Sequence, residues 1–275
     1  MTRRRWIADE VNGNTAALLG EHAIHLIRVL RAEVGQEFDI AAGSEVRLGT
    51  IVSISADRVE FALGLAREMK TAPTITPNIT LALAIFKFDR MEWAIEKCTE
   101  IGVARIIPLI ARRSDAHLAA AAAKRRERWQ RIVRQASEQS RRPGPPEITA
   151  PVKLKDLDSV LPAGAVTRVV LAESLAESDS DSGEVRLGEI LKIPVSSPCE
   201  TELTPSLPES SAATALSQSQ PTEVALAVGP EGGWADEELA WFRAAGWAAA
   251  SLGDTILRAE TAAIVAMAIA VEALR

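Results

Sequence analysis

Two short glycine-containing segments near the C-terminal end of the chain have the composition of ligand-binding loops. They are the Gly-Pro-Glu-Gly-Gly run at 229–233 and the segment 252–262. Each follows a short apolar run typical of a strand, and each precedes a helical pattern. Loops at the carboxyl ends of neighbouring strands are where α/β proteins bind small molecules. The two segments therefore predict a single ligand site that both loops enclose.

Most glycine-rich turns between a strand and a helix are only turns, because glycine and proline supply the backbone angles that turns need. The run at 229–233 has neither the spacing of a dinucleotide-binding fingerprint nor the Lys-Ser/Thr pair of a P-loop. The second segment adds Arg258 and Glu260 beside an apolar helical pattern, where unpaired charges are costly. The two segments together favour a binding site over two ordinary turns.

The elements that would position these loops alternate along the chain from residue 79 onward. Apolar, strand-like runs occur at 79–86, 103–110, 166–172, 223–228 and 248–251. Helical patterns occur at 90–101, 119–140, 236–245 and from 259 to the C-terminal end. This alternation predicts an α/β fold with a mostly parallel sheet covered by helices. Gly102 is expected to end the first of these helices.

The first 70 residues have a different pattern, with short β-type runs separated by turn residues. The runs lie at 6–8, 38–40, 46–54 and 58–65, and a helix is expected at 21–31. Short strands with close turns predict a small barrel. The proline-containing segment 71–78 is typical of a linker. We therefore expect two domains, at 1–72 and 73–275.

Residues 173–222 interrupt the alternation with 11 serines, 5 prolines and 9 acidic residues. Such a composition cannot bury enough apolar surface to offset the entropy of ordering, which predicts a mobile insertion over 174–222. The stretch 184–193 is its one candidate for regular structure. A neutral surface insertion is expected, and a regulatory role is the alternative.

The net charge of −6 conceals an uneven distribution of charge. Residues 1–150 hold 23 Lys and Arg against 18 Asp and Glu, whereas residues 151–275 hold 8 against 19. The segment 105–142 alone has 11 basic and 3 acidic residues. Local charge governs phosphate binding more than the global sum, so a nucleic-acid partner is compatible with the acidic total.

Cysteine usage and hydropathy predict a soluble protein of the reducing cytoplasm. Cys98 and Cys199 are far apart and have no zinc-ligand spacing, which argues against a metal site or a disulfide framework. The basic N-terminal start lacks the apolar core of a signal peptide. No apolar run approaches the roughly 18 residues of a membrane span, so no membrane association is expected.

These segments and three further motifs resemble the RsmE family, SPOUT-class methyltransferases that modify N3 of a uridine in 16S ribosomal RNA. The further motifs are H-L-I-R-V-L-R at 25–31, K-C-T-E-I-G-V at 97–103 and E-Q-S-R-R at 138–142. Cys98, Ile101 and the pair Asp254-Thr255 depart from the family pattern. The resemblance covers almost the whole chain apart from the insertion. Its rivals are a SPOUT methyltransferase acting on tRNA and a non-catalytic RNA-binding or ribosome-assembly protein.

The resemblance implies a C-terminal SPOUT domain with a deep trefoil knot and an N-terminal PUA-like, RNA-binding barrel. The knot would gather three loops around S-adenosylmethionine, held largely through backbone groups. The residues implied in cofactor binding are Leu171, Ala172, Glu173, Gly229, Pro230, Glu231, Gly232, Gly233, Leu252, Gly253, Ile256, Leu257, Arg258, Ala259 and Thr261. Glycine suits this role because it lets the main chain approach a ligand closely.

Methylation of a uridine at N3 needs an acceptor for the departing proton and donors for charge on O2 and O4. Arg258 and Glu260 are the candidate catalytic residues, and Glu231 is the rival base. The alternatives are structural. Either Arg258 and Glu260 pair with each other, or Glu260 and Thr261 cap the last helix.

The partner implied by the resemblance is 16S rRNA or the small ribosomal subunit. In the helix 119–140, three arginines are expected opposite the core-facing residues, where they contact phosphate or are merely solvated. The candidate RNA-binding residues are Arg3, Arg4, Arg5, Arg28, Arg31, Arg128, Arg131, Arg134, Arg141 and Arg142. The last helix is apolar on nearly every face, including Met267, which predicts that it packs across the interface of a homodimer.

Overall fold

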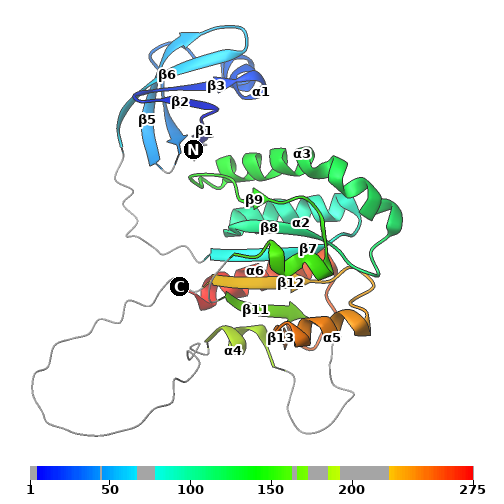
Figure 1. The fold of residues 1–275 in the computed structure, drawn as a ribbon. Coiled ribbons are helices and arrows are strands. Elements are labelled where there is room, and N and C mark those ends of the chain that lie inside the picture. The colour runs from blue at the N-terminus through cyan, green and yellow to red at the C-terminus, as the bar shows by residue number, and fades with distance from the viewer. Residues whose placement is uncertain are drawn as a thin grey trace, which may run out of the picture.

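The computed structural model describes residues 5–43, 45–66, 78–162, 166–172, 185–192 and 223–274. The described chain forms two β-sheets, each with its own core (Figure 1). Sheet A belongs to the N-terminal unit and sheet B to the C-terminal unit. The predicted linker and most of the insertion 174–222 lie outside the described residues.

Sheet A has six strands in the order β1-β4-β5-β6-β3-β2. They are β1 (Trp6–Ile7), β2 (Glu10–Asn12), β3 (Thr15–Leu19), β4 (Glu37–Ala42), β5 (Glu45–Ile54) and β6 (Arg58–Ala66). The β1–β4 pair is parallel and the others are antiparallel. Because β1 and β2 remain edge strands, the predicted barrel is a curled half-barrel.

The predicted helix at 21–31 is shorter and less regular than expected. Helix α1 (Gly20–Ile24) runs into a π-helical turn, η1 (His25–Val29). The turn ends next to Arg31, whose φ of +50° lies in the left-handed region. A β-hairpin of β2 and β3 precedes α1 and was not predicted. Its two-residue turn is Gly13-Asn14, with Gly13 at a φ of +58°.

Sheet B is parallel throughout and has the strand order β10-β8-β7-β12-β11-β13, with β9 also paired to β8. Its strands are β7 (Asn78–Ala84), β8 (Arg105–Ile110), β9 (Glu147–Ile148), β10 (Val152–Lys153), β11 (Val166–Leu171), β12 (Glu223–Val228) and β13 (Ala248–Ala250). The α/β prediction with a mostly parallel sheet is confirmed. The short strands β9 and β10 were not predicted.

Helices cover both faces of sheet B (Figure 1). One face packs against α2 (Phe88–Ile101), α3 (Ala116–Gln139), α4 (Leu187–Lys192) and α6 (Ala259–Ala273). The other packs against α5 (Asp236–Ala244) and the 3₁₀ helix η2 (Leu154–Ser159). Gly102, at a φ of +128°, ends α2 as predicted. Helix α4 confirms the structured stretch expected inside the insertion.

The central strands divide their side chains between the two cores by alternation. On β12, Val224, Leu226 and Val228 face the core under α2 and α6, whereas Ala225 and Ala227 face the core under α5. The small alanines leave room for the aromatic side chains of α5 and its flanks. Each fully buried large aliphatic side chain contributes about 1.5–3 kcal/mol, so both faces stabilise the sheet.

The apolar faces of helix α6 are packed against other elements of the same chain. The dimer prediction assumed that a second subunit would have to bury them. Met267 is fully buried and belongs to the core formed with α2, β7 and β12. Ile264 and Ile269 are partly buried against the same core, and α4 packs against the helix as well. An apolar helix of this kind needs cover on several sides, and neighbouring elements of one chain supply it.

The two units meet at a polar junction between β1, α1 and the end of α3. Arg134 donates from Nη2 to the carbonyl of Ile7 at 2.6 Å, and its Nη1 lies 2.8 Å from Oδ1 of Asp9. His22 lies between two carboxylates, 3.7 Å from Asp9 and 3.8 Å from the buried Glu138. Four charged or ionisable side chains therefore join sheet A to α3.

None of the helices in the described ranges combines the length and the apolar content that a membrane crossing would need.

Candidate functional site

The three predicted cofactor loops emerge at one edge of sheet B. Strand β11 pairs with β12 on one side and with β13 on the other, and all three run parallel. Their carboxyl ends therefore place residues 171–172, 229–233 and 252–258 at the same edge. The structure thus brings together the loops that the sequence predicted, apart from Glu173, which lies outside the described residues.

The loop after β12 is closed by its own turn and by an indole. The amide of Gly233, at a φ of +67°, donates to the carbonyl of Pro230 at 2.8 Å. Trp234 donates from Nε1 to the carbonyl of Leu171 at 2.9 Å and so ties this loop to the end of β11. A Cβ on Gly229 would lie 3.2 Å from the Trp234 ring. Gly229 is therefore needed for the close approach of an indole, whether or not a ligand is bound.

The far end of this loop is fixed to the loop after β8. Arg113 donates from Nη1 to the carbonyl of Gly232 at 2.9 Å. The buried carboxylate of Glu238 accepts from the backbone amides of Arg112 and Ala235, at 2.8 and 2.9 Å, which also caps the start of α5. These contacts tie the loop after β12 to the loop after β8 and to the start of α5.

The loop before α6 is more open. Gly253 has a φ of +128° and no atom within 4 Å of the position that a Cβ would take. Ile256 is 81% exposed, although it is a large apolar side chain. Arg258 is exposed at the N-cap of α6, and no side chain caps that helix. The first amides of α6 are thereby available to a ligand.

Asp254, in the same loop, departs from the family pattern and contacts α4. Its carboxylate lies 3.2 Å from Nη2 of Arg186, and both side chains are largely exposed. Leu187 also donates its amide to the carbonyl of Ser251 at 3.0 Å. The described part of the insertion therefore packs directly beside the third loop.

Glu260 is the most unusual charged residue at this edge. Its side chain is only 8% exposed, and Oε1 lies 3.9 Å from Nε of Arg90 in the first turn of α2. Its Oε2 is buried and has no hydrogen-bond partner within the described part of the chain. Arg90 also donates from Nη1 to Oε1 of Glu231 at 3.1 Å. One arginine thus contacts both candidate bases, and the alternative pairing of Glu260 with Arg258 does not occur among the described ion pairs.

The remaining cofactor candidates of the third loop and the first turn of α6 are buried or partly buried. Ala259 is buried, and Leu252, Leu257 and Thr261 are partly buried. Thr261 does not supply a side-chain cap to α6. The candidates on the third loop and the first turn of α6 are therefore close to one another in the fold, as the sequence predicted.

The predicted RNA-binding arginines separate into two groups, and the first is engaged within the chain. Arg134 is part of the domain junction. Arg142 donates from Nη1 to the carbonyl of Thr99 at 2.7 Å, and burial lowers the pKa of its guanidinium. Arg5 donates to the carbonyl of Arg141. The expectation that Arg134 lies on a free face opposite the core is wrong, because sheet A covers that end of α3.

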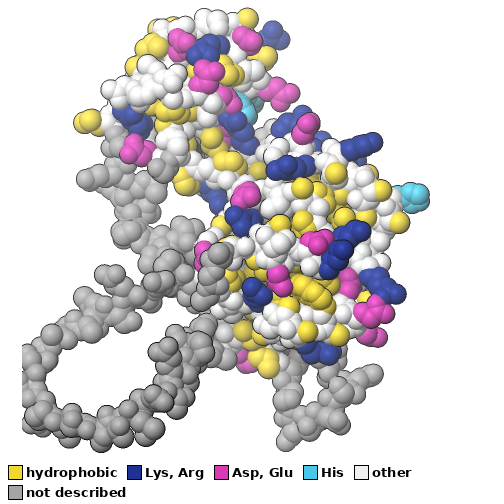
Figure 2. All heavy atoms as spheres, viewed as in Figure 1, with side chains coloured by type: hydrophobic (Ala, Val, Ile, Leu, Met, Phe, Trp, Pro, Cys, Tyr) yellow, Lys and Arg dark blue, Asp and Glu magenta, His cyan; other side chains and the backbone are white. Residues whose placement is uncertain are grey.

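The second group is exposed. Arg28 and Arg31 lie on the surface beside η1, and Arg131 lies on the surface of α3. Arg128 is 55% exposed and contacts Glu92 with its Nε at 2.8 Å. Figure 2 shows Lys and Arg side chains gathered over α3. Arg3 and Arg4 lie outside the described residues.

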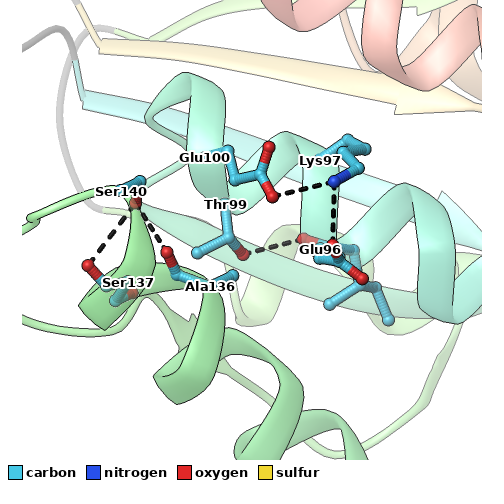
Figure 3. Close-up of polar contacts among 8 residues, drawn as sticks. Glu96, Lys97, Thr99, Glu100, Ala136, Ser137 and Ser140 are labelled. Atoms are coloured by element: carbon cyan, nitrogen blue, oxygen red, sulfur yellow. Dashed lines mark hydrogen bonds and ion pairs between the residues drawn. The ribbon is translucent and has the colours of Figure 1, made fainter. Parts of the chain in front are cut away.

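A cleft of about 810 Å³ separates sheet A from α2 and α3. Its lining includes His22, His25, Glu96, Glu100 and Arg141. The C-terminal ends of α2 and α3 form one wall of the cleft (Figure 3). On α2, Nζ of Lys97 lies 2.8 Å from Oε1 of Glu96 and 2.9 Å from Oε1 of Glu100. These two hydrogen bonds raise the pKa of Lys97. The cleft lies at the C-terminal end of α2, whereas Arg90 lies at its start.

The described residues contain no group of three or more potential metal ligands. Cys98 is fully buried, and burial raises the pKa of its thiol to about 12, which makes a thiolate nucleophile unavailable at neutral pH.

Sequence reasoning missed Arg90, Arg113 and Glu238, which fix the loops in place. A signal was present for Arg90, because it follows the strand predicted at 79–86 and so belongs to the same carboxyl edge as the three loops. Arg113 and Glu238 carry no such signal, since their roles depend on contacts between segments more than 100 residues apart.

Comparison with known proteins identifies the family of this chain. A family model described as an RNA methyltransferase domain matches residues 74–271. A ribosomal RNA small subunit methyltransferase E from Synechocystis is 32% identical over 263 residues, which cover 94% of this chain and 74% of that protein. The protein of the same name from Mycobacterium bovis is 30% identical over 260 residues, which cover 93% of this chain and 85% of the relative.

Solved structures are similar over nearly the whole chain. The ribosomal RNA small subunit methyltransferase E of Neisseria gonorrhoeae, bound to S-adenosyl methionine, has a TM-score of 0.71 and 25% identity and covers 97% of this chain and 95% of its own. A Legionella pneumophila structure with the bound cofactor SAM has a TM-score of 0.72 and 28% identity, with coverage of 98% and 97%. The chain therefore belongs to the ribosomal RNA small subunit methyltransferase E family, as its motifs predicted, and its C-terminal unit has the SPOUT fold.

Proposed function

We propose that this protein transfers a methyl group from S-adenosylmethionine to N3 of a uridine in 16S ribosomal RNA. Family membership supports the reaction class and the RNA substrate. The observation that carries the assignment of the site is the convergence of three loops around a buried carboxylate with one unpartnered oxygen. The uridine N3 position comes from the resemblance of the motifs to the family.

The residues at the sheet edge fit the cofactor. Gly253 leaves open space, and the uncapped start of α6 offers backbone amides. The buried Oε2 of Glu260 lacks the hydrogen bond that a buried polar atom normally makes, which indicates a ligand group in this position. S-adenosylmethionine supplies a methyl group on a positively charged sulfur, which makes that methyl electrophilic.

Glu260 is the proposed general base. The carboxylate accepts the proton of uridine N3, the N3 lone pair forms the new bond to carbon, and the bond from carbon to sulfur breaks. The products are N3-methyluridine, S-adenosylhomocysteine and a protonated Glu260, which then loses its proton to water. Arg258 is exposed beside the site and is positioned to donate to negative charge on O2 or O4.

RNA is proposed to bind through the exposed basic residues rather than through those engaged at the domain junction. Arg131 on α3, Arg28 in η1 and Arg31 just after it are exposed, and Arg128 is 55% exposed while it pairs with Glu92. Phosphate contacts of this kind position an RNA without reading its sequence. We propose 1–72 as a PUA-like RNA-binding domain and 73–275 as the methyltransferase domain, in the cytoplasm. The trefoil knot depends on connections outside the described residues and stays a prediction.

A homodimer is also proposed, on different grounds from the burial of α6. Ile256 is 81% exposed and Trp93 is 48% exposed. Trp93 lies three residues after Arg90 on α2, hence on the same side of that helix, and Ile256 lies in the loop before Glu260. Exposed apolar side chains that flank a site are typical of a surface that a partner covers.

The test is methylation by the purified protein of small ribosomal subunits that lack the modification. Nucleosides from the reacted rRNA are separated and identified by mass spectrometry. We expect N3-methyluridine to form with wild-type protein and to be lost with Glu260→Gln. Methylation of tRNA instead of rRNA, or of a position other than N3, would overturn the substrate assignment, and a fully active Glu260→Gln would overturn the base.

A further inference from the structure

Arg90 joins two segments of the site that are distant in the sequence. Its Nη1 donates to Glu231 in the loop after β12 at 3.1 Å, and its Nε lies 3.9 Å from Glu260 in the first turn of α6. The Arg90 side chain is 35% exposed, whereas the Glu260 side chain is 8% exposed. The arginine thus reaches from the surface towards a carboxylate that solvent scarcely touches.

The burial of Glu260 makes this contact important. An ionised carboxylate that loses its hydration is strongly destabilised unless an opposite charge or hydrogen bonds compensate. Among the described ion pairs, Arg90 is the partner of Glu260, and its Nε lies 3.9 Å from Oε1. Oε2 is left buried without a hydrogen bond. The contact therefore compensates the charge while leaving one oxygen open to a ligand.

We propose that Arg90 is a positioning residue for methyl transfer. By contacting Oε1 of Glu260, it orients that side chain and aims Oε2 at the proton on the target nitrogen. Through its second contact it couples the orientation of Glu260 to the loop that contains Glu231. This inference rests on the proposed function, in which Glu260 is the base.

The geometry favours arginine over lysine at this position. Two different nitrogens of the guanidinium, Nη1 and Nε, face two carboxylates that approach from separate loops. A lysine ammonium carries the charge but lacks the planar array that can serve both partners at once. Arg90→Lys is therefore expected to restore part of the function that a neutral residue loses.

The chain offers a matched control in sheet A. Arg58 also contacts two carboxylates, those of Glu10 at 2.9 Å and Glu60 at 2.8 Å, and its side chain is 37% exposed. Its partners belong to β2 and β6, away from the three loops. Arg58→Gln removes a comparable arginine without changing the proposed site. It measures how far the loss of an arginine between two carboxylates affects stability and activity in general.

The experiment compares full-length wild-type protein, Arg90→Gln, Arg90→Lys and Arg58→Gln in steady-state methylation of small ribosomal subunits. We expect Arg90→Gln to lower kcat by about a hundredfold, at the lower end of what a positioned base contributes, with KM for RNA within about threefold of wild type. Arg90→Lys should recover at least about tenfold of that loss, and Arg58→Gln should match wild type. Thermal melting of each variant verifies that it is folded.

A double-mutant cycle then asks whether Arg90 acts through Glu260. In a Glu260→Gln background, Arg90→Gln should lower the remaining rate by less than about twofold, because the group it positions is gone. The inference is overturned if Arg90→Gln retains a kcat within about threefold of wild type, if its effect is undiminished in that background, or if Arg90→Lys recovers nothing while remaining folded. An inactive wild-type protein would instead overturn the proposed function itself.

Discussion

Two buried glutamates of this protein, Glu138 and Glu260, sit beside arginines but are enclosed differently. Glu138 is 0% exposed at the domain junction, where Nε of Arg134 lies 3.6 Å and Nε2 of His22 lies 3.8 Å from the same oxygen. Glu260 has one described ion-pair partner, Arg90 at 3.9 Å, and lies at the edge of sheet B where the three loops emerge. The first carboxylate is surrounded from two elements, and the second is open on one side.

The difference indicates what each carboxylate does. A buried carboxylate in contact with two cationic or ionisable partners contributes to the assembly of the fold, because removing it takes away part of the counter-charge of both partners. A buried carboxylate with one partner at 3.9 Å is stabilised less, and proteins retain such groups mainly at sites where a ligand completes them. Replacement of Glu260 should therefore lower activity more than stability, and replacement of Glu138 should lower stability more than activity.

The largest expected effect is the loss of methyl transfer in Glu260→Gln. Removal of a general base lowers a rate by roughly 10²–10⁴-fold, whereas the change should leave the melting temperature near that of wild type, since Oε2 makes no contact to lose. Rates under single-turnover conditions and thermal melting measure the two properties. Full activity would show that another group, such as Glu231, accepts the proton.

Glu138→Gln should show the reverse pattern. It removes one of the two carboxylates, Glu138 and Asp9, that both Arg134 and His22 contact, which we expect to cost about 1–3 kcal/mol of unfolding free energy. Cofactor affinity measured by calorimetry should stay within about twofold of wild type, because the junction lies away from the three loops. Unchanged stability in chemical denaturation would mean that the comparison of the two glutamates is mistaken.

A smaller effect, on the affinity for S-adenosylmethionine, is expected from substitutions at the glycines of the loops. The sequence predicted that Gly232 and Gly253 are needed for the same reason, but the structure separates them. Gly253 has a φ of +128°, so Gly253→Val should be strained by about 1–3 kcal/mol and should weaken S-adenosylmethionine binding about tenfold or more.

At Gly232 an added Cβ would lie 3.5 Å from Cβ of Arg113, an ordinary contact, and the backbone is not left-handed. Gly232→Ala should therefore bind the cofactor within about twofold of wild type, a difference that calorimetry resolves. Equal and severe losses in both variants would show that a ligand fills the space above Gly232 as well.

The exposed arginines test whether α3 contacts RNA. Reversing Arg128 and Arg131 to Glu removes two phosphate contacts, so the slope of log affinity against log salt should become less steep by up to about 2. Affinity for S-adenosylmethionine should not change. Arg134→Gln serves as the internal comparison. It should lower stability, because it removes the junction contacts, and it should leave the salt slope unaltered. A slope that is unchanged in all variants would mean that the face of α3 with Arg128 and Arg131 is merely solvated.

Much of the fold could be predicted because its signals are local. Continuous apolar runs identify the strands of a doubly covered parallel sheet, and Gly102 marks the end of α2 by its conformation. The hairpin of β2 and β3 also carries a sequence signal, the Gly13-Asn14 pair of its two-residue turn, but the flanking strands are too short to support it. Strands such as β9, only two residues long, carry too little pattern to detect.

The site was predictable only in part, for a physical reason. The three loops follow strands, so their place at the sheet edge comes from topology. The partner of Glu260, the packing of Met267 and the engagement of Arg134 depend on elements that meet from distant parts of the chain. A helical pattern shows which face of one helix is apolar, but it does not show whether a neighbouring domain covers the polar face.

The smallest expected effect is on stability and concerns Asp9, which lies with Glu138 at the domain junction. Burial raises the pKa of Asp9, but the hydrogen bonds from His22 and from the amide of Leu19, with the charge of Arg134, outweigh burial and hold this pKa below its usual value. A carboxylate whose pKa is lowered on folding stabilises the protein above its unfolded pKa of about 3.9. That contribution is lost as the pH falls through the lower pKa of the folded state.

Asp9→Asn should therefore lower the unfolding free energy by no more than about 1 kcal/mol at pH 7, in the range of partly exposed ion pairs. The difference from wild type should be constant between pH 7 and pH 5 and should shrink below about pH 4, where the wild-type carboxylate also loses its charge. Chemical denaturation at several pH values measures it. A difference that grows on acidification would mean that Asp9 is not ionised in the folded protein, and the junction would then owe its stability to His22 and Glu138 rather than to the Arg134–Asp9 pair.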